Sequence, residues 1–572
     1  MRIGRLGLLF TQLIFALNIF GQTIQKDELT KKKKLYWDLK NKHLMAEGAY
    51  YKNNLGIQFN KEERHGLWKF YSKEGELEEE RMYYRNRIHG KQNKFHLNGA
   101  LKSEAYFTFN VPDSIYKEFN EKGVLIAIGS FDLGSPIGEW KYYYEDKHPK
   151  STELIRNDTI YTMEYWTPDS LHEKTIIQGE GFINNYFQSG KIKESYSFKN
   201  GLKNGLFIER TANGQTTVSG QFENGLKMGE WKFYHFSGVL EKIINFNQDK
   251  LDGSYKVYYR DGTINTEGQY ENGEKSGTWY WNFEDGKIEM KGDFYKNNQN
   301  GAWIFNFPSG QRSYNANFKN GSKDGLWEYF YVNGEKYKKG IFLNNKKEGV
   351  WTTWYENGNV LMEGSYKNGK EQGIWKNYWE NGNLKNKSNF KKGNLHGRWY
   401  SYNLNQILIV SGNYRDGLKS GKWVDYFDNG RLMKKSAYRI IKRKNEINGV
   451  TKYGMKRKLS EFHGKFEAYS PDDYFLQAKG KFNKGQKHGT WIDFYPGGNI
   501  PNTISQFKNG NLHGYMRRFD RRGRILSDTY FKDGKKDGWF VIFGTNGKIK
   551  VKKYFRNGKE VLRKQNDNLF SP

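Results

Sequence analysis

The stretch GIWKNYWENGNLKNKSNFKKGNLHG, residues 373–397, contains one complete repeat of the chain and decides its fold. It begins and ends on a glycine, and it is divided by an Asn-Gly pair at 381–382 and by Gly393. An Asn-Gly pair between apolar runs is the strongest short-range signal for a β-hairpin, because a type I′ turn needs positive φ at both central residues. The stretch therefore predicts strand, turn, strand, turn.

The first glycine of this stretch, which we call the timing glycine, recurs through most of the chain. Eleven timing glycines fall 24 residues apart from Gly181 to Gly421, and they include Gly205, Gly229, Gly277, Gly325 and Gly373. The spacing continues at Gly66, Gly90, Ser114, Gly138, Gly464, Gly489, Gly514 and Gly538, which gives 19 units in three arrays. Such a period is typical of a repeat protein. At about 4.8 Å between strands, we expect a single-sheet ribbon on the order of 180 Å long.

Aromatic residues keep the same register. Two residues after the timing glycine, 11 of the 17 tryptophans occur, among them Trp231, Trp279, Trp327, Trp375 and Trp423. Seven residues before it, another aromatic recurs, beginning with Phe59 and Tyr83. Trp375 and Tyr378 differ by three positions, so in a plain strand they would face opposite sides of the sheet. Either both faces are apolar or a bulge intervenes, and an open aromatic face would form a long binding groove.

A further turn lies four residues before the timing glycine, as at Gly369 and Gly417. In three units of the central array this glycine is replaced by Asp249, Asn297 or Asn345, and in the first array Asn86 and Asn110 hold the position. After glycine, these residues enter left-handed backbone space at least cost, so we expect a positive φ there.

The motif G-x-W-x-x-Y-x-x-N-G-x-L, as in residues 373–384, followed by F-x-x-G-x-x-x-G, as in 390–397, resembles the variant form of the MORN (membrane occupation and recognition nexus) repeat. The resemblance covers roughly residues 56 to 560. It implies an elongated antiparallel sheet that acts as a scaffold or binds proteins or lipids. Some bacterial relatives carry an antitoxin label, which gives an antitoxin-like partner protein as an alternative.

Composition narrows the classes further. The 572 residues are 17% aromatic, which argues against disorder, and they include 64 glycines but only 9 prolines, a balance that favours strands and hairpins. The chain has no cysteine, which excludes disulfides and thiolate metal sites. A formal net charge of +31 favours contact with anionic surfaces. A solvated basic surface is the alternative.

The N-terminus predicts export. Arg2 and Arg5 precede an apolar run from Leu6 to Phe20, with a small residue, Gly21, after it. This is the pattern of a secretory signal peptide, and an uncleaved anchor is the alternative. We expect these segments: signal peptide 1–21, irregular N-terminal segment or cap 22–55, first array 56–144, insert 145–178, central array 179–438, basic insert 439–462, third array 463–560, and C-terminal tail 561–572.

Two steps of 43 residues, from Gly138 to Gly181 and from Gly421 to Gly464, interrupt the register. Inserts in repeat proteins fall on loops of one face, so specific contacts are expected there; a longer hairpin is the alternative. The candidate contacts to an anionic surface all come from the second insert: Arg439, Lys442, Arg443, Lys444, Lys452, Lys456, Arg457 and Lys458.

The sequence predicts no catalytic, cofactor or metal site. Six of the 11 histidines, His65, His89, His396, His463, His488 and His513, directly precede a timing glycine, where other units have Asn, Asp, Ser or Gln. A position that accepts such residues does not hold a catalytic base. His488 and His513 are one unit, about 10 Å, apart, too far to share a zinc ion.

We therefore expect an exported, non-catalytic scaffold or binding module for a protein or glycan partner, in the periplasm, the outer envelope or outside the cell. The alternative of a different class is peripheral binding to anionic membrane or lipopolysaccharide. No nucleic-acid partner is expected for an exported protein.

Overall fold

The computed structural model describes residues 29–52, 62–447 and 450–562, and within these ranges the chain forms strands and turns with no helix. It contains 46 strands, which pair in antiparallel fashion with their neighbours along the chain. The expected fold class, an all-β ladder of antiparallel hairpins, is confirmed. In the described part of the chain, no helix is long and apolar enough to cross a membrane. The predicted signal peptide, residues 1–21, lies outside the described residues.

The chain divides into two compact halves, Met1–Glu274 and Lys275–Pro572. The strands of the N-terminal half are β1 (Lys33–Tyr36), β2 (Leu44–Tyr50), β3 (Arg64–Tyr71), β4 (Leu77–Tyr84), β5 (Arg87–Phe95), β6 (Leu101–Thr108), β7 (Val111–Phe119), β8 (Leu125–Asp132), β9 (Ser135–Tyr143), β10 (Pro149–Arg156), β11 (Thr159–Trp166), β12 (Lys174–Ile177), β13 (Glu180–Tyr186), β14 (Ile192–Lys199), β15 (Leu202–Arg210), β16 (Thr216–Glu223), β17 (Leu226–Tyr234), β18 (Leu240–Asn247), β19 (Lys250–Tyr258) and β20 (Ile264–Glu271).

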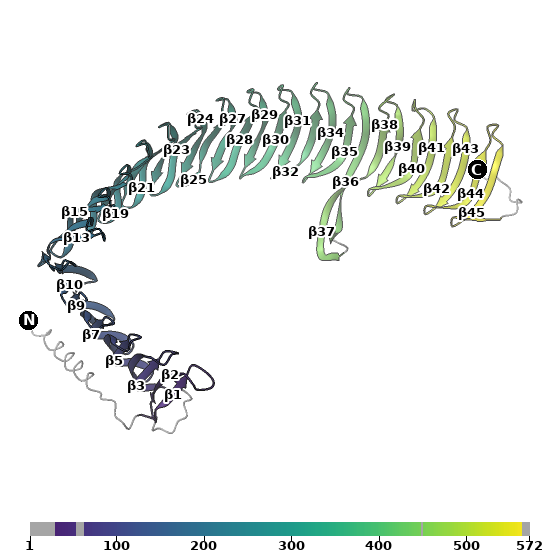
Figure 1. The fold of residues 1–572 in the computed structure, drawn as a ribbon. Helices are drawn as coiled ribbons and strands as arrows, with labels where there is room; N and C mark the ends of the chain where they lie inside the picture. The colour runs from purple at the N-terminus through teal and green to yellow at the C-terminus, as the bar shows by residue number, and fades with distance from the viewer. Residues whose placement is uncertain (1–28, 53–61, 448–449, 563–572) are drawn as a thin grey trace, which may run out of the picture. The chain divides into compact units, whose positions relative to one another are not determined.

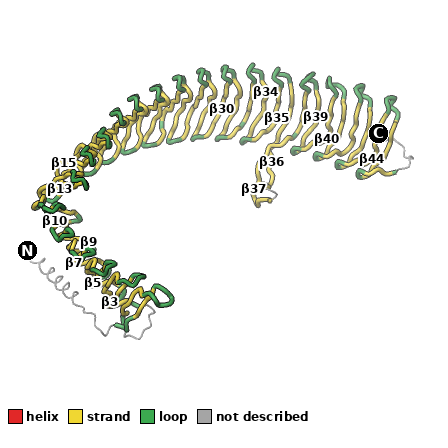
Figure 2. The backbone as a smooth tube through the Cα atoms, viewed as in Figure 1, coloured by secondary structure: helices red, strands yellow, loops and turns green. Residues whose placement is uncertain are grey.

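The strands of the C-terminal half follow one another side by side in sequence order (Figures 1 and 2). They are β21 (Glu274–Asn282), β22 (Ile288–Tyr295), β23 (Asn298–Asn306), β24 (Arg312–Lys319), β25 (Ser322–Lys323), β26 (Gly325–Phe330), β27 (Lys336–Leu343), β28 (Lys346–Trp354), β29 (Val360–Lys367), β30 (Lys370–Tyr378), β31 (Leu384–Lys391), β32 (Asn394–Leu395), β33 (Gly397–Tyr402), β34 (Leu408–Arg415), β35 (Leu418–Tyr426), β36 (Leu432–Ile447), β37 (Val450–Phe462), β38 (Gly464–Tyr469), β39 (Leu476–Asn483), β40 (Gln486–Phe494), β41 (Pro501–Lys508), β42 (Asn511–Phe519), β43 (Ile525–Lys532), β44 (Lys535–Phe543), β45 (Ile549–Arg556) and β46 (Lys559–Val561).

Ten of the eleven timing tryptophans are buried, and Trp399 is half-buried. Trp375 shows how the ring packs on the preceding strand. Glu363 pairs with Lys376 and Ser365 with Gln372, so the three residues 373–375 of β30 bulge opposite the single residue Gly364 of β29. The Trp375 ring lies over Gly364, where an added Cβ would collide with its ring carbons. The indole Nε1 donates to the carbonyl of Ser365 at 3.2 Å, and only 4% of Trp375 is exposed. The indole thus packs without leaving a buried donor unpaired.

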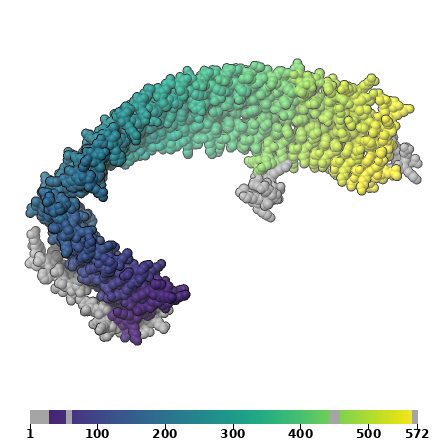
Figure 3. Space-filling model, viewed as in Figure 1, coloured from purple at the N-terminus to yellow at the C-terminus, as the bar shows by residue number. Residues whose placement is uncertain are grey.

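This arrangement repeats along both halves. Glycines nine residues before the timing glycine lie under its tryptophan in six further units: Gly129 under Trp140, Gly220 under Trp231, Gly292 under Trp303, Gly340 under Trp351, Gly412 under Trp423 and Gly480 under Trp491. Packed side chains, rather than open gaps, occupy the intervals between the strands (Figure 3). The buried hydrophobic residues form small clusters along the sheet, such as the one around Trp303, Ala316 and Trp327.

The two turns of a unit differ from each other. Lys392 and Gly393 both have positive φ, 53° and 85°, which is the type I′ pattern. At 381–382 only Gly382 has a positive φ, 86°, and its N–H donates to the carbonyl of Trp379 at 2.9 Å. The prediction of type I′ geometry at the Asn-Gly pairs was therefore wrong, although the hairpin forms. The loop is longer because the register shifts between Asn377 and Tyr378, where Lys385 bulges from the partner strand.

Trp375 and Tyr378 lie on opposite faces of the sheet, as expected for a plain strand. The Tyr378 hydroxyl donates to Glu363 Oε1 at 2.7 Å, and the same oxygen is 2.8 Å from Lys376 Nζ. Tyr378 therefore lies on the face of Lys376, opposite Trp375, and the bulged residue at this point is Lys385 of β31.

The Asn and Asp residues that replace glycine in the short turn do have positive φ, from 63° at Asn86 to 75° at Asn110. They also bind the preceding unit, which the sequence did not indicate. Asn345 Oδ1 accepts a hydrogen bond from the backbone N–H of Lys323 at 2.8 Å, and Asp249 Oδ1 accepts one from Lys227 at 2.8 Å.

The segment 22–55, expected to be irregular, contains β1 and β2, and β2 supplies the missing neighbour for the first tryptophan. Trp68 lies over Gly48 and donates to the carbonyl of Ala49 at 2.8 Å. Tyr50 packs edge-on against Trp68 with ring centroids 5.0 Å apart, in the place expected for Phe59, which lies outside the described residues. A strand that reproduces the Trp-over-Gly contact caps the ladder because a terminal unit needs a neighbour.

The tryptophan contact predicts a size limit at Gly364. Gly364→Val is expected to destabilise β29 and β30 by about 1–3 kcal/mol, because its side chain and the Trp375 ring would occupy the same space. Hydrogen exchange of these strands and urea unfolding measure the loss. Gly364→Ala is the matched control with a smaller effect, since Ala316 lies at the equivalent position of the Trp327 unit. Equal stability of the valine variant and the wild type would contradict the contact.

The two roles of Asn345 can be separated. Asn345→Gly keeps the left-handed backbone and removes the hydrogen bond to Lys323, so a loss of about 0.5–1.5 kcal/mol is expected. Asn345→Ala adds the cost of a Cβ in left-handed space, about 1 kcal/mol more. Urea unfolding of the two variants measures both terms, and equal midpoints would rule out the backbone role.

Candidate functional site

The periodic residues serve the fold. The timing glycines Gly205, Gly229, Gly277, Gly325 and Gly373 have φ between 64° and 98°, in the left-handed region. The tryptophans Trp231, Trp279, Trp327, Trp375 and Trp423 are 1–4% exposed. Neither set faces a ligand.

Two of the histidines before a timing glycine have a structural role. His513 Nδ1 is 3.3 Å from the backbone N of Asp533, and His65 Nδ1 is 3.3 Å from that of Arg85. In other units the same position supplies a carboxylate or amide oxygen to the equivalent N–H, as Glu348 does for Asn368 at 2.8 Å. The position therefore holds a hydrogen-bond acceptor that ties one unit to the next.

The tryptophan face is not an open aromatic groove. A lysine two residues before the timing glycine lies over the ring, with Lys347 Nζ 4.6 Å from the Trp351 centroid and 4.7 Å from that of Tyr366. Desolvation by burial lowers the pKa of Lys347. Lys323, Lys419 and Lys487 lie in the same way over Trp327, Trp423 and Trp491. Cation–π contact thus adds to unit packing and covers the rings.

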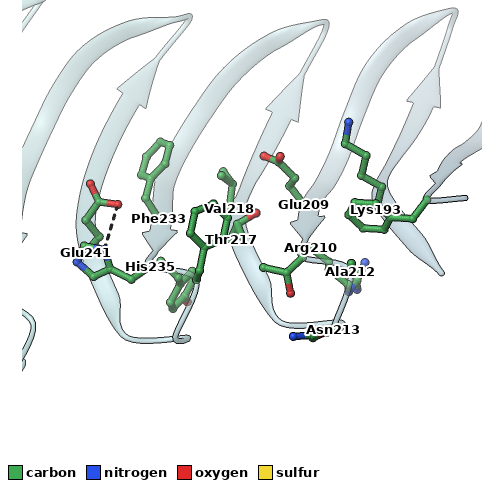
Figure 4. Close-up of a pocket in the computed structure, with 14 residues that line it drawn as sticks. Lys193, Glu209, Arg210, Ala212, Asn213, Thr217, Val218, Phe233, His235 and Glu241 are labelled. Atoms are coloured by element: carbon green, nitrogen blue, oxygen red, sulfur yellow. Dashed lines mark ion pairs between the residues drawn. The ribbon is translucent and has the colours of Figure 1, made fainter. Parts of the chain in front are cut away.

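One hollow of about 660 Å³ opens in the N-terminal half, on the side chains of β14 to β18 near the turns that follow β13, β15 and β17 (Figure 4). Glu209 pairs with Val218, and Val218 with Phe233, so the three side chains share one face of consecutive strands. Phe187 and Phe236 complete the apolar lining, and Phe236 is 84% exposed. We call this the Phe236 groove.

Two polar atoms of this groove lack a partner in the described part of the chain. The buried atoms Arg210 Nη1 and Thr217 Oγ1 make no hydrogen bond. His235 Nδ1 faces Glu241 Oε2 at 4.0 Å on the rim (Figure 4). A buried donor without an acceptor is costly, so this groove is suited to a ligand that brings oxygen acceptors.

The basic insert forms a longer hairpin, which the sequence offered as the alternative to a loop that makes specific contacts. β36 and β37 extend beyond their neighbours and project from the row of strands (Figure 1). Lys442 pairs with Lys458, and both are exposed, as are Arg439 and Arg457. The side chains of Arg443, Lys444, Lys452 and Lys456 lie outside the described part. Like charges directly opposite each other repel, so their retention in one hairpin suits an anionic counterpart.

The first insert adds strands β10 to β12 to the sheet. Its loops bring together Asp146, His148 and His172, whose ligand atoms lie within 4.8 Å of one another. Sequence reasoning weighed only the histidines in register. The available signal was that His148 and His172 are out of register and lie inside an insert.

The repeats resemble a known family, and the chain aligns at low identity with solved structures. A family model described as the MORN repeat variant matches the chain at residues 64–86, 229–248, 251–272, 275–297, 347–368 and 371–392. A search of curated proteins finds no match. Among solved structures, the Photorhabdus luminescens Tc holotoxin pore aligns at 11% identity over 90% of this chain and 31% of that one, with a TM-score of 0.12.

An alternansucrase in complex with isomaltononaose aligns at 15% identity over 60% of this chain and 23% of that one, also with a TM-score of 0.12. The chain thus spans about a third or less of these proteins. TM-scores this low indicate no shared overall fold, and nothing about function is transferred from either structure.

Proposed function

The chain carries repeats of the MORN variant family, and from this premise we propose that it is an exported, non-catalytic binding scaffold that holds a glycan in the Phe236 groove. The observation that carries the proposal is the unpaired guanidinium nitrogen of Arg210 in a groove with the exposed ring of Phe236. A protein partner is the competing occupant.

The chemistry of the groove favours a glycan. Sugar rings present apolar C–H faces that pack on aromatic side chains, while their hydroxyl and carboxylate oxygens accept hydrogen bonds. Phe187, Phe233 and Phe236 supply aromatic surface for the C–H faces of a sugar. Arg210 and Thr217 supply hydrogen-bond donors for its oxygens. Glu209 and Glu241 add acceptors for sugar hydroxyls. Export through the N-terminal segment would place the groove where envelope glycans occur.

The remaining periodic side chains support the non-catalytic part of the proposal. His65 and His513 act as acceptors for backbone N–H groups, and tryptophans such as Trp351 are enclosed by glycine below and lysine above. Groups already engaged in this way are not available for proton transfer or nucleophilic attack.

A glycan array probed with the purified protein tests the proposal. We expect retention of one glycan class, and Phe236→Ala and Arg210→Ala should each weaken binding about tenfold or more, a loss of about 1.4 kcal/mol. Tyr295→Ala is the matched control, because Tyr295 is an aromatic residue of the C-terminal half that is 56% exposed and lies outside the groove. Retention of no glycan, or equal binding by all variants, would reject it. Release of a hydrolysis product would reject the non-catalytic part.

A second candidate function is attachment to an anionic membrane or lipopolysaccharide through the projecting hairpin. The motivating observation is the pairing of Lys442 with Lys458, with Arg439 and Arg457 exposed beside them. Basic side chains close to an anionic lipid surface are attracted within a Debye length, so this binding weakens as salt rises.

Co-sedimentation with vesicles of anionic and neutral lipid tests this second function. We expect binding at low salt that falls at high salt, and a large decrease for the double variant Arg457→Glu, Lys458→Glu. Lys367→Glu in β29 is the control for an exposed lysine outside the hairpin. If the double variant and the control lose the same small amount, the net charge of the chain, and not the hairpin, explains the binding.

A further inference from the structure

Two loops at the first insert bring two histidines and an aspartate together. Asp146 and His148 lie in the loop between β9 and β10, and His172 lies in the loop between β11 and β12. Asp146 occupies the position of the Asn or Asp of an Asn-Gly turn, eight residues after Gly138. The cluster therefore joins two loops at the place where the 24-residue register breaks.

All three side chains converge on one carboxylate oxygen. His172 Nε2 is 2.8 Å from Asp146 Oδ2, and His148 Nδ1 is 3.3 Å from the same oxygen. The two imidazole rings are stacked, with centroids 4.1 Å apart and planes inclined by 18°. Asp146 Oδ1 accepts from the backbone N–H of His148 at 3.0 Å, which is the first cause of a lowered pKa of Asp146. The carboxylate is therefore ionised at neutral pH.

The two ring nitrogens of His172 face two acceptors. His172 Nδ1 is 3.3 Å from the carbonyl oxygen of Thr167, and Nε2 is 2.8 Å from Asp146 Oδ2. A neutral imidazole carries one proton, so it donates to only one of them. When Nδ1 carries that proton, the lone pair of Nε2 and the carboxylate oxygen face each other and are suited to a shared metal ion.

From this geometry we propose that Asp146, His148 and His172 bind a divalent transition metal of the zinc type. Zinc takes imidazole nitrogens at about 2.0–2.1 Å and carboxylate oxygens at about 2.0–2.2 Å. Ligand atoms within 4.8 Å of one another reach such an ion by small side-chain rotations. The carbonyl of Thr167 holds the tautomer of His172 that leaves Nε2 free, as outer contacts of metal-binding histidines do. Water would complete the coordination.

The loop that carries His172 is held in a fixed conformation. His172 has φ of 47°, a left-handed value that a non-glycine residue adopts at a cost. Asp169 Oδ1 accepts from the backbone N–H groups of Leu171 and His172 at 3.1 and 3.2 Å, and from Thr167 Oγ1 at 2.9 Å. The His172 side chain is 12% exposed, against 56% for His148, so one ligand is fixed and one is free to close on the ion.

The metal would act as a cross-link. It would join the β9–β10 loop to the β11–β12 loop and stabilise the short strand β12, which has two residues paired with β13. This inference does not rest on glycan binding, because the Phe236 groove is lined by residues 187–241.

Equilibrium dialysis of the full chain against zinc chloride at pH 7.5 tests the site. We expect one zinc per chain, with at least tenfold weaker binding for His172→Ala, His148→Ala and Asp146→Asn. The asparagine variant keeps the size of the side chain and so guards against misfolding. His513→Ala is the matched control, because His513 forms a His–Asp pair with Asp533 at 3.1 Å outside this three-residue cluster. Binding should weaken at low pH, because a metal-bound imidazole nitrogen must be deprotonated.

A thermal melt provides the second readout, and zinc should raise the melting temperature of the wild type but not of His172→Ala. Absence of zinc binding at pH 7.5, or binding that the three variants leave unchanged, would overturn the proposal. In that case a proton, and not a metal ion, lies between His172 and Asp146.

Discussion

In eight units of this protein, an indole ring lies where the neighbouring strand has no Cβ. The bulge of residues 373–375 places the Trp375 ring over Gly364, and the indole N–H binds the adjacent carbonyl. The left-handed timing glycine makes this bulge possible, and the lysine two residues before it covers the outer side of the ring. A thin sheet thus obtains buried apolar volume without a second layer.

The other contacts of the unit act between neighbours in the same way. Asn345 reaches back to Lys323, Glu348 reaches forward to Asn368, and the hydroxyl of Tyr355 donates to the carbonyl of Tyr378 at 2.9 Å. Stability in such a ladder is a sum of unit and nearest-neighbour terms. Most residues in register are therefore committed to the fold. The projecting hairpin and the histidine cluster lie in the two inserts, whereas the Phe236 groove lies within the regular central array.

Much of this fold could be predicted from the sequence, because left-handed turn positions admit few residues. A positive φ is required at the timing glycine and in the short turn. This requirement explains why Gly, Asn or Asp occupies positions such as Asn345. Gly364 could not be interpreted in this way, because its φ is not left-handed and its role depends on a ring eleven residues later. The cap formed by β2 was missed because the Gly48 to Trp68 spacing is longer than in the regular units. In the histidine cluster, His148 and His172 are 24 positions apart and lie in an insert that has no timing glycine. Their contact was therefore not predicted from the sequence.

The central claim is that the indole N–H groups of eight timing tryptophans are enclosed and hydrogen-bonded within the sheet. Trp140 Nε1 differs, since it has no partner in the described part of the chain. Hydrogen–deuterium exchange of these groups, followed by NMR on protein labelled with ¹⁵N-tryptophan, tests it directly. The account predicts strongly slowed exchange for the indoles of Trp231, Trp303, Trp351, Trp375, Trp423 and Trp491. Exchange of these indoles at the rate of a free, solvated tryptophan would contradict it.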